Sequence, residues 1–297
     1  MTAPTTDEGD ARRVPASPSV IVASVRGATH VRDGRPNQDA VGSWQGPGVR
    51  PVVVVAVSDG HGSATCFRSE AGARWAVAVA LDCGRRLLAD TAGHDRASIE
   101  RRAGVDLPGE IVDRWSQAVT DEIERRPFTD DELAPVESRG RLAVDANPLL
   151  AYGATLIVGL ASEAYAVFVQ VGDGDVLTAD AEGDATRPVA RDGRLFADET
   201  TSLCMPGAAG EFRVGSRPLV GGSPVLALLA TDGLANAYPE DGDFLRVGPD
   251  LRAQVREHGL ATVSERLEGW LQEASVHSGD DVTAALIWFG DAPASTA

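Results

Sequence analysis

The chain has 297 residues, of which 43% are hydrophobic and 24% charged, and its formal net charge is −17. These proportions are typical of a globular protein and exclude a fibrous or largely disordered chain. A charge of this sign is repelled by nucleic acid and by anionic membranes, so we predict neither as a partner. No apolar run approaches the ~18 residues of a membrane helix, and the polar N-terminus lacks the apolar stretch of a secretion signal. We therefore expect a cytoplasmic protein, and a monomer.

The basic residues and the cysteines exclude some kinds of catalytic and metal site. All 27 basic residues are arginine, so no lysine can serve as a nucleophile, a Schiff base or a phosphate clamp. The three cysteines, Cys66, Cys83 and Cys204, form no Cys-x-x-Cys pair. This scatter argues against a disulfide framework and against a zinc ribbon.

The chain begins with a polar segment and two predicted strands. Residues 1–18 are rich in Thr, Ala, Pro and acidic side chains and are predicted to be a disordered tail. Residues 20–25 are apolar and predict a strand. Residues 52–57 form a continuous, mostly β-branched run, which predicts a strand buried on both faces.

A predicted helical region follows. Residues 69–88 carry Ala, Val and Leu at helical spacing and predict a helix. Residues 95–126 are charged and also helical in pattern, and we expect breaks near Gly104 and Pro108. Residues 127–148 are polar and punctuated, so we predict a loop there.

The second half of the chain contains a cluster of short strands. These are predicted at residues 154–160, 165–171, 175–179, 212–214, 225–230 and 282–289. Gly172-Asp173-Gly174 predicts a tight hairpin turn between the second and third of them. An amphipathic helix is predicted at residues 251–271, and residues 291–297 form a short tail.

The order of the elements indicates the fold class. The strands cluster and do not alternate strictly with helices, which favours an α+β fold with antiparallel sheets flanked by helices. No candidate linker divides residues 19–290, so we predict one domain.

Four acidic residues lie beside predicted strands. Asp59, Asp173 and Asp232 follow strands, and Asp280 precedes the last one. Several carboxylates converging there would raise each other's pKa unless a cation neutralised them. Oxygen-only ligand sets suit Mg²⁺ and Mn²⁺, and two such ions ~3.5–4 Å apart can stabilise an in-line phosphoryl transfer. Because Asp-Gly is a common turn dipeptide, each site taken alone also fits a plain turn.

Six motifs, in order, resemble those of the type 2C metal-dependent protein serine/threonine phosphatases, over about residues 26–286. The motifs are Pro36-Asn37-Gln38-Asp39-Ala40, Asp59-Gly60-His61-Gly62, Gly153-Ala154-Thr155, Gly172-Asp173, Thr231-Asp232-Gly233-Leu234 and Asp280-Asp281-Val282-Thr283. Glu199-Thr200-Thr201-Ser202-Leu203 is similar to a bacterial branch of that family. The resemblance implies a four-layer α-β-β-α sandwich, in which two antiparallel sheets form a metal cleft at one edge.

The resemblance also implies a ligand set for two Mn²⁺ or Mg²⁺ ions. Asp59 would bridge the two ions, and the Gly60 carbonyl would complete the second. Asp232 and Asp280 would bind the first. Asp173 matches a residue that helps to bind a third, weaker ion together with Asp232.

Further roles follow from the same resemblance. Asp39 would hold metal-bound water, directly or through Gln38, and His61 matches a histidine thought to protonate the leaving serine or threonine oxygen. These roles imply hydrolysis of phosphoserine and phosphothreonine in proteins. The partner would be a phosphorylated protein, such as a serine/threonine kinase or its substrate.

Several positions depart from the family pattern. Gly34 lies where the family often has a phosphate-binding arginine. Either Arg32 or Arg35 could present a guanidinium to phosphate, and we favour Arg35 because it lies closer to Asp39.

Other departures affect charge. Gln38 replaces a frequent Glu and adds no charge, so the second metal would bind more weakly. Asn236 replaces an Asp, and Asp281 replaces the usual Asn. We expect Asp281 to support the site, with Asp280 as the ligand.

Two segments resemble variable parts of the family. Residues 180–211 correspond to a flap beside the cleft, where protein substrates are chosen. Residues 95–147 look like a helical and loop addition, either an extra surface layer or a docking surface.

Two other functions remain open from the sequence. The altered arginine, Gln38 and Asn236 fit a weak or inactive relative that binds a kinase or phosphoprotein as a regulatory module. A Ca²⁺-binding structural domain would need an EF-hand or repeat spacing, and the chain has neither.

Overall fold

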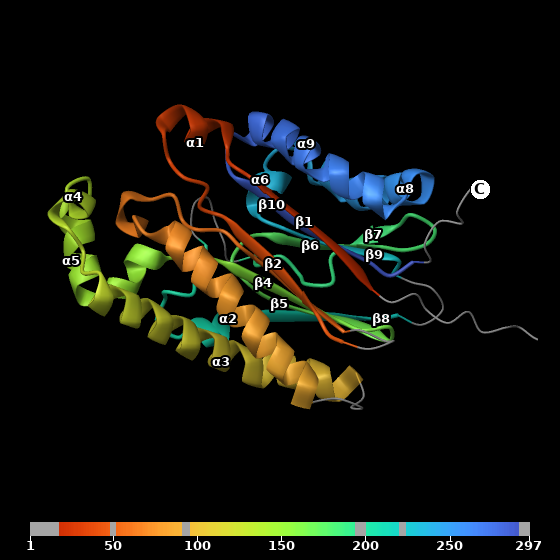
Figure 1. The fold of residues 1–297 in the computed structure, drawn as a ribbon, viewed down its shortest axis with the longest axis horizontal. Coiled ribbons are helices and arrows are strands. Elements are labelled where there is room, and N and C mark those ends of the chain that lie inside the picture. Colours follow the sequence, from red (N-terminus) through yellow and green to blue (C-terminus); the bar gives the residue numbers. More distant parts are fainter. Residues whose placement is uncertain (1–17, 48–51, 91–95, 194–199, 220–223, 291–297) are drawn as a thin grey trace, which may run out of the picture.

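The computed structural model describes residues 18–47, 52–90, 96–193, 200–219 and 224–290. The predicted tails at residues 1–18 and 291–297 lie outside these ranges, apart from residue 18. Two five-stranded sheets stack face to face, and helices cover both outer faces (Figure 1). Every strand pair within them is antiparallel. The prediction of an α+β, four-layer α-β-β-α sandwich is confirmed.

The strand order places the long buried strands at the centre of each sheet. The first sheet runs β2 (Ala40–Gln45), β3 (Val53–Ser58), β4 (Leu156–Ala161), β5 (Tyr165–Val171) and β8 (Arg213–Pro218). The second runs β1 (Ser19–Val25), β10 (Val282–Trp288), β9 (Leu226–Ala230), β6 (Asp175–Ala179) and β7 (Ala185–Thr186).

β3 illustrates why the sequence folds into layers. Val53, Val55 and Val57 pack between the two sheets, whereas Val54 and Ala56 pack against the helices. Each of these side chains is at most 1% exposed. Successive side chains of a strand point to opposite faces, so a strand covered on both faces must be apolar throughout.

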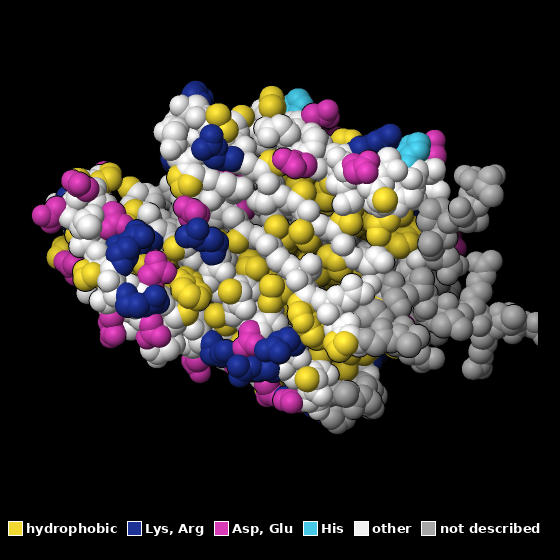
Figure 2. Space-filling view, in the orientation of Figure 1, with side chains coloured by type: hydrophobic (Ala, Val, Ile, Leu, Met, Phe, Trp, Pro, Cys, Tyr) yellow, Lys and Arg dark blue, Asp and Glu magenta, His cyan; other side chains and the backbone are white. Residues whose placement is uncertain are grey.

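Helices cover the outer face of each sheet. The first sheet is covered by α2 (Ser69–Asp90) and α3 (Arg96–Arg125), and the second by α8 (Val247–His258) and α9 (Leu260–Ser278). In the view of Figure 2, charged side chains lie over the helices, and hydrophobic side chains gather over the sheets between the two helix layers. None of the helices in the described ranges is long and apolar enough to cross a bilayer.

The helical region contains the first corrections. The predicted breaks near Gly104 and Pro108 are wrong, because α3 runs through both residues. A proline inside a helix removes one backbone hydrogen bond and crowds the preceding turn, but the buried side chains of Leu107, Ile111 and Trp115 hold this part of the helix in the core. Residues 96–125 therefore form part of the helix layer over the first sheet.

The predicted loop at residues 127–148 is also wrong in part. It contains α4 (Asp130–Leu133) and α5 (Ser138–Ala146), and a 3-10 turn, η2 (Pro148–Tyr152), follows. Both α-helices are short, and the buried residues of α5 are limited to Val144. Periodicity over so few residues gives little signal.

Three further differences concern the strands and the last helices. The predicted hairpin at Gly172-Asp173-Gly174 is wrong, because β5 and β6 lie in different sheets and the turn passes the chain between them. The single helix predicted at 251–271 is two helices, α8 and α9, separated at Gly259 with a φ of 83°. β2 and β7 were not predicted.

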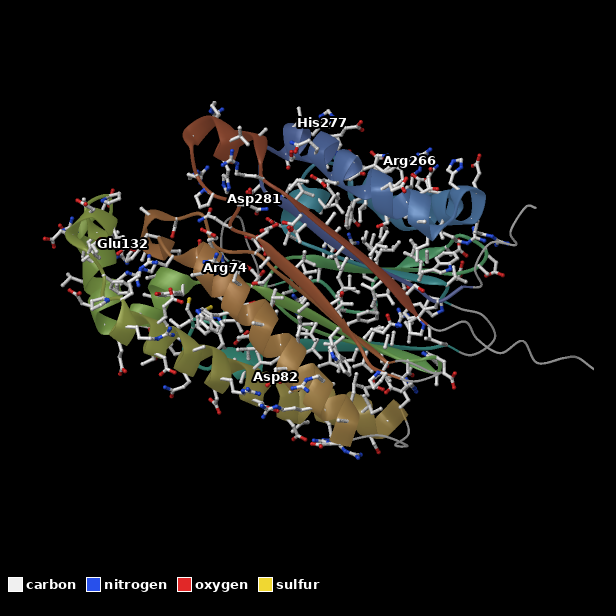
Figure 3. All side chains as sticks on the ribbon, in the orientation of Figure 1. Arg74, Asp82, Glu132, Arg266, His277 and Asp281 are labelled. Carbon is white, nitrogen blue, oxygen red and sulfur yellow. The ribbon has the colours of Figure 1, made fainter. Side chains whose placement is uncertain are left out.

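A buried arginine connects the helical corner to the rest of the chain. Arg68 is 4% exposed, and its guanidinium donates to both carboxylate oxygens of Glu132, each at 2.8 Å. It also donates to the Tyr152 hydroxyl (2.8 Å). Glu132 lies on the short helix at the edge of the molecule (Figure 3). These bonds fix the start of α2 and so the loop between β3 and α2.

Candidate metal centre

The register of the first sheet places two acidic residues side by side. Ala40, the first residue of β2, pairs with Ser58, the last residue of β3. Asp39 therefore precedes β2 at the same end of the sheet where Asp59 follows β3. The backbone of Asp59 is fixed there, because its N–H donates to the Thr155 hydroxyl (3.1 Å) and its carbonyl accepts from the Thr155 N–H (2.8 Å).

The register of the second sheet brings three more acids to this end. Ala230, the last residue of β9, pairs with Ala284 near the start of β10 and with Asp175 at the start of β6. The loops that carry Asp232, Asp280 and Asp173 therefore lie at one edge of this sheet. Stacking the two sheets brings both groups of acids together.

Three of the predicted ligands meet in a cleft. Asp59, Asp173 and Asp232 each present a carboxylate oxygen, and these oxygens all lie within 4.8 Å of one another. Gly60, His61 and Asp280 line the same cleft.

Two predicted site residues lie somewhat apart from this trio. Asp280 is grouped with His30 and Asp281 instead, and its side chain is 48% exposed. Asp39 is 8% exposed, and its carboxylate accepts a hydrogen bond from the Thr231 hydroxyl (2.8 Å).

The carboxyl groups raise each other's pKa. Burial raises the pKa of Asp39 to about 8, and the charges of Asp281 and Asp232 add to this effect. Burial, together with the charge of Asp173, raises the pKa of Asp232 to about 6. The pKa of Asp59 rises well above its usual range, again through burial and then through Asp39 and Asp232. So much gathered negative charge requires protons or a cation.

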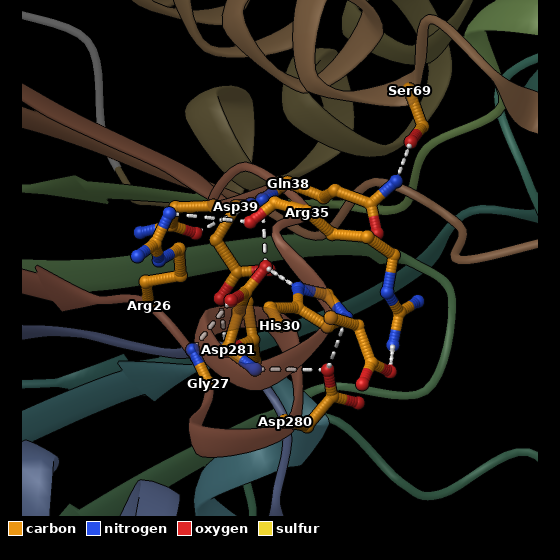
Figure 4. A network of polar contacts seen from close by, with 12 residues as sticks. Arg26, Gly27, His30, Arg35, Gln38, Asp39, Ser69, Asp280 and Asp281 are labelled. Carbon is orange, nitrogen blue, oxygen red and sulfur yellow. Dashed lines mark hydrogen bonds and ion pairs between the residues drawn. The ribbon is translucent and has the colours of Figure 1, made fainter.

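The uncharged donors also fit a cation. Gln38 lines the cleft, and its Oε1 is a buried acceptor without a hydrogen-bond partner. Its Nε2 donates to the Ser69 hydroxyl at 2.7 Å (Figure 4). A set of carboxylate and amide oxygens suits Mg²⁺ or Mn²⁺ more than a soft metal. The residues present therefore fit the metal that the sequence predicts.

Gly60 is required by close backbone packing. A Cβ on Gly60 would lie 2.7 Å from the carbonyl oxygens of both Gln38 and Ser69. Its N–H donates to the Gln38 carbonyl (3.2 Å), which ties the two loops together. No larger residue could occupy this position without moving the backbone.

His61 is held over Gly153. Its backbone N–H donates to the Gly153 carbonyl (3.1 Å), and a Cβ on Gly153 would lie only 2.7 Å from the His61 Cδ2. Burial lowers the pKa of the imidazole, and the charge of Asp173 opposes this effect. Proximity to Asp173 keeps the ring within the electrostatic field of the acidic cluster.

The structure separates the two candidate arginines. Arg35 lines the cleft, with its side chain 38% exposed and 3.7 Å from the Asp33 carboxylate. Arg32 is 72% exposed and hydrogen-bonds to Asp33 at 2.9 Å. Of these two, Arg35 is the one that faces the cleft.

The described part of the segment 180–211 borders the cleft from the other side. Thr200, Thr201 and Ser202 line it. The Thr201 hydroxyl accepts from the Gly172 N–H (2.9 Å), and the Ser202 hydroxyl accepts from the Ala154 N–H (3.2 Å). Glu199 lies outside the described residues.

Sequence reasoning missed three supporting residues. Thr231 hydrogen-bonds to Asp39, Ser69 to Gln38, and His30 to Asp281. Thr231 precedes a predicted ligand and could have been suspected for that reason. His30 and Ser69 lie on helices outside the matched motifs, and only the fold brings them to the site.

We expect the metal-free protein to lose stability as the pH rises. The pKa of Asp39 is about 8 in the folded protein, against a usual 3.8. The folded state therefore binds more protons than the unfolded state within this window, so stability falls as pH rises from about 4 to about 8. Asp39→Asn should flatten this slope in urea unfolding with a chelator present. Exposed Asp243→Asn is the control, and an unchanged slope in Asp39→Asn would contradict the assignment.

The comparisons with known proteins agree with this geometry. The sequence profile of protein phosphatase 2C matches residues 26–272. No curated protein matches the chain.

Several solved structures share the fold. A bacterial serine phosphatase is 14% identical, with a TM-score of 0.59 over 92% of this chain and 98% of that one. Stp1 of Staphylococcus aureus, a serine/threonine phosphatase, is 16% identical, with a TM-score of 0.57 over 96% and 100% of the two chains. The catalytic domain of the phosphatase PstP, solved with two manganese ions, is 17% identical, with a TM-score of 0.54 over 92% and 99%.

At these identities the solved structures establish the fold alone, whereas the profile covers most of the chain. Of the six acidic residues at or beside the cleft, four fall inside the match, namely Asp39, Asp59, Asp173 and Asp232, and Asp280 and Asp281 follow it. The chain belongs to the protein phosphatase 2C family.

Proposed function

We propose that this protein hydrolyses phosphoserine and phosphothreonine in protein substrates with the help of divalent cations. The main support is the convergence of Asp59, Asp173 and Asp232, whose carboxylate oxygens lie within 4.8 Å of one another in an open cleft. The family of the chain and its raised carboxyl pKa values agree with this function.

The cleft would hold two Mn²⁺ or Mg²⁺ ions, with a third, weaker site. In this proposal Asp59 would bridge the two ions, the Gly60 carbonyl would complete the second, and Asp232 and Asp280 would bind the first. Asp173 and Asp232 contribute to the weaker site. Such ions activate water and neutralise charge on the phosphoryl oxygens. Because the related PstP domain was solved with two manganese ions, Mn²⁺ is the first ion to test.

Residues around the ions would orient the reacting groups. The free acceptor Gln38 Oε1 would receive a hydrogen bond from water in the cleft. Buried Asp39 would help to hold that water, directly or through Gln38. His61 would give its proton to the leaving serine or threonine oxygen, as a general acid. Arg35 would bind phosphate through its guanidinium fork.

The substrate would be a phosphorylated protein, and a serine/threonine kinase or its substrate fits this class. Described residues of the segment 180–211 line the cleft, among them Thr200, Thr201 and Ser202. We also propose that the protein acts as a cytoplasmic monomer, which size-exclusion chromatography can test in part.

Asp59→Asn should abolish turnover of a phosphoserine peptide in the presence of Mn²⁺, because it removes one charge from the bridging position. The fold should remain intact by circular dichroism. Exposed Asp243→Asn should keep wild-type turnover. Wild-type turnover by Asp59→Asn would refute the bridging role, and a wild type inactive at every Mn²⁺ concentration would favour a regulatory, phosphoprotein-binding module.

Arg35→Ala should raise KM for a phosphopeptide about tenfold, the effect of losing ~1.4 kcal/mol of charge-assisted hydrogen bonding. Arg32→Ala is the matched control, since its side chain is exposed and paired with Asp33. Steady-state kinetics measures both. Equal KM values for the two variants would show that Arg35 does not bind the phosphoryl group.

His61→Ala should lower kcat on a phosphoserine peptide by ~10²-fold or more, the usual contribution of a general acid. The loss should be much smaller on an aryl phosphate, whose leaving group needs no proton. If the rate on the phosphopeptide and the acidic limb of its pH profile match those of the wild type, the role of His61 is wrong.

A further inference from the structure

The carboxylate of Asp281 is fully engaged by the chain itself. One oxygen accepts from the Gly27 N–H (2.6 Å), and the other accepts from the Gln38 N–H (2.6 Å) and from His30 Nδ1 (2.8 Å), as Figure 4 shows. The residue is 3% exposed. A carboxylate with three such donors has little capacity left for a cation, so Asp281 acts on the site through its neighbours.

One of these neighbours is His30, on the short helix α1 (Ala28–Asp33). Its ring is buried, with the side chain 6% exposed. Because Asp281 accepts a hydrogen bond from Nδ1, the orientation of the ring is fixed and its Nε2 points the other way. Nε2 lies 3.7 Å from Oδ1 of Asp280 (Figure 4).

Asp280 needs such a support more than the other acids do. Its side chain is 48% exposed, and it stands apart from the trio of Asp59, Asp173 and Asp232. Its Oδ1 also accepts from the Asp281 N–H (2.8 Å). Oδ1 of Asp280 is thus held by the next backbone N–H and faces His30. Oδ2 is the oxygen without these two contacts.

We propose that His30, oriented by Asp281, is a positioning residue that holds the Asp280 carboxylate for a divalent cation. This inference rests on the proposed function, in which Asp280 is a ligand. Partners that orient a ligand in this way commonly change metal affinity by ~10–100-fold when they are removed. His30 is not one of the proposed ligands, so its effect passes through Asp280.

Two substitutions separate the two nitrogen atoms of the ring. His30→Asn places an amide N–H near the position of Nδ1, so it can keep the bond to Asp281 but cannot reach Asp280. His30→Gln places an amide N–H near the position of Nε2, so it can still reach Asp280. His277→Asn, an exposed histidine on α9, is the control. Calorimetric titration of Mn²⁺ into each metal-free protein gives the Kd, and thermal unfolding of the same samples gives Tm.

We expect His30→Asn to raise the Kd for Mn²⁺ about tenfold with little change in Tm. His30→Gln should recover part of that affinity, and His277→Asn should match the wild type. If His30→Asn and His30→Gln lower Tm but leave the Kd of the folded protein unchanged, His30 is structural only and the proposal is wrong.

Three other outcomes are informative. Pulsed electron paramagnetic resonance of bound Mn²⁺ would show coupling to a ¹⁴N nucleus that disappears in His30→Asn if His30 were itself a ligand, and this would overturn a positioning role. A wild-type protein that binds no Mn²⁺ would overturn the proposed function. Binding by the wild type with an unchanged Kd in His30→Asn would overturn only this inference.

Discussion

The mutual repulsion of carboxylates at one end of the two sheets is the constraint on which the site depends. Asp39, Asp59 and Asp232 are held where burial and neighbouring charge raise their pKa values. Bringing these carboxyl groups together costs free energy, since each loses hydration there. The packing of β3, β9 and β10 in the core supplies the free energy that holds their ends together, and a cation then offsets the repulsion.

The rest of the architecture keeps this edge rigid. Thr155 fixes the backbone of Asp59, and Asp281 joins the start of β10 to α1 and to the loop before β2. Gly60 allows two loops to touch where a side chain would not fit. The Asp281 carboxylate, an acceptor stronger than an amide oxygen, holds three donors.

The fold was largely predictable because its buried strands carry an unambiguous pattern. Residues 165–171 and 175–179 coincide with β5 and β6. Their connection was not predictable, since Gly-Asp-Gly permits a tight turn equally well within one sheet or between two. α3 passes through Pro108 because burial of its inner face outweighs local propensity. β2 was missed because its short, half-polar sequence gives no clear alternation.

The acids of the site were predictable from their positions beside strands, but their partners were not. Which of Arg35 and Arg32 faces the cleft depends on the direction in which the chain leaves α1. Which of Asp280 and Asp281 is the ligand depends on hydrogen-bond donors from residues more than 200 positions away in the chain. His30 carries no motif at all. Such contacts arise from tertiary structure, and no local pattern encodes them.

Anomalous diffraction from crystals soaked in Mn²⁺ tests the central claim most directly. The account predicts two strong peaks in the cleft, both within coordination distance of the Asp59 carboxylate, with Asp232 and Asp280 on one of them. A cleft without peaks, or peaks that leave Asp59 uncoordinated, would contradict it.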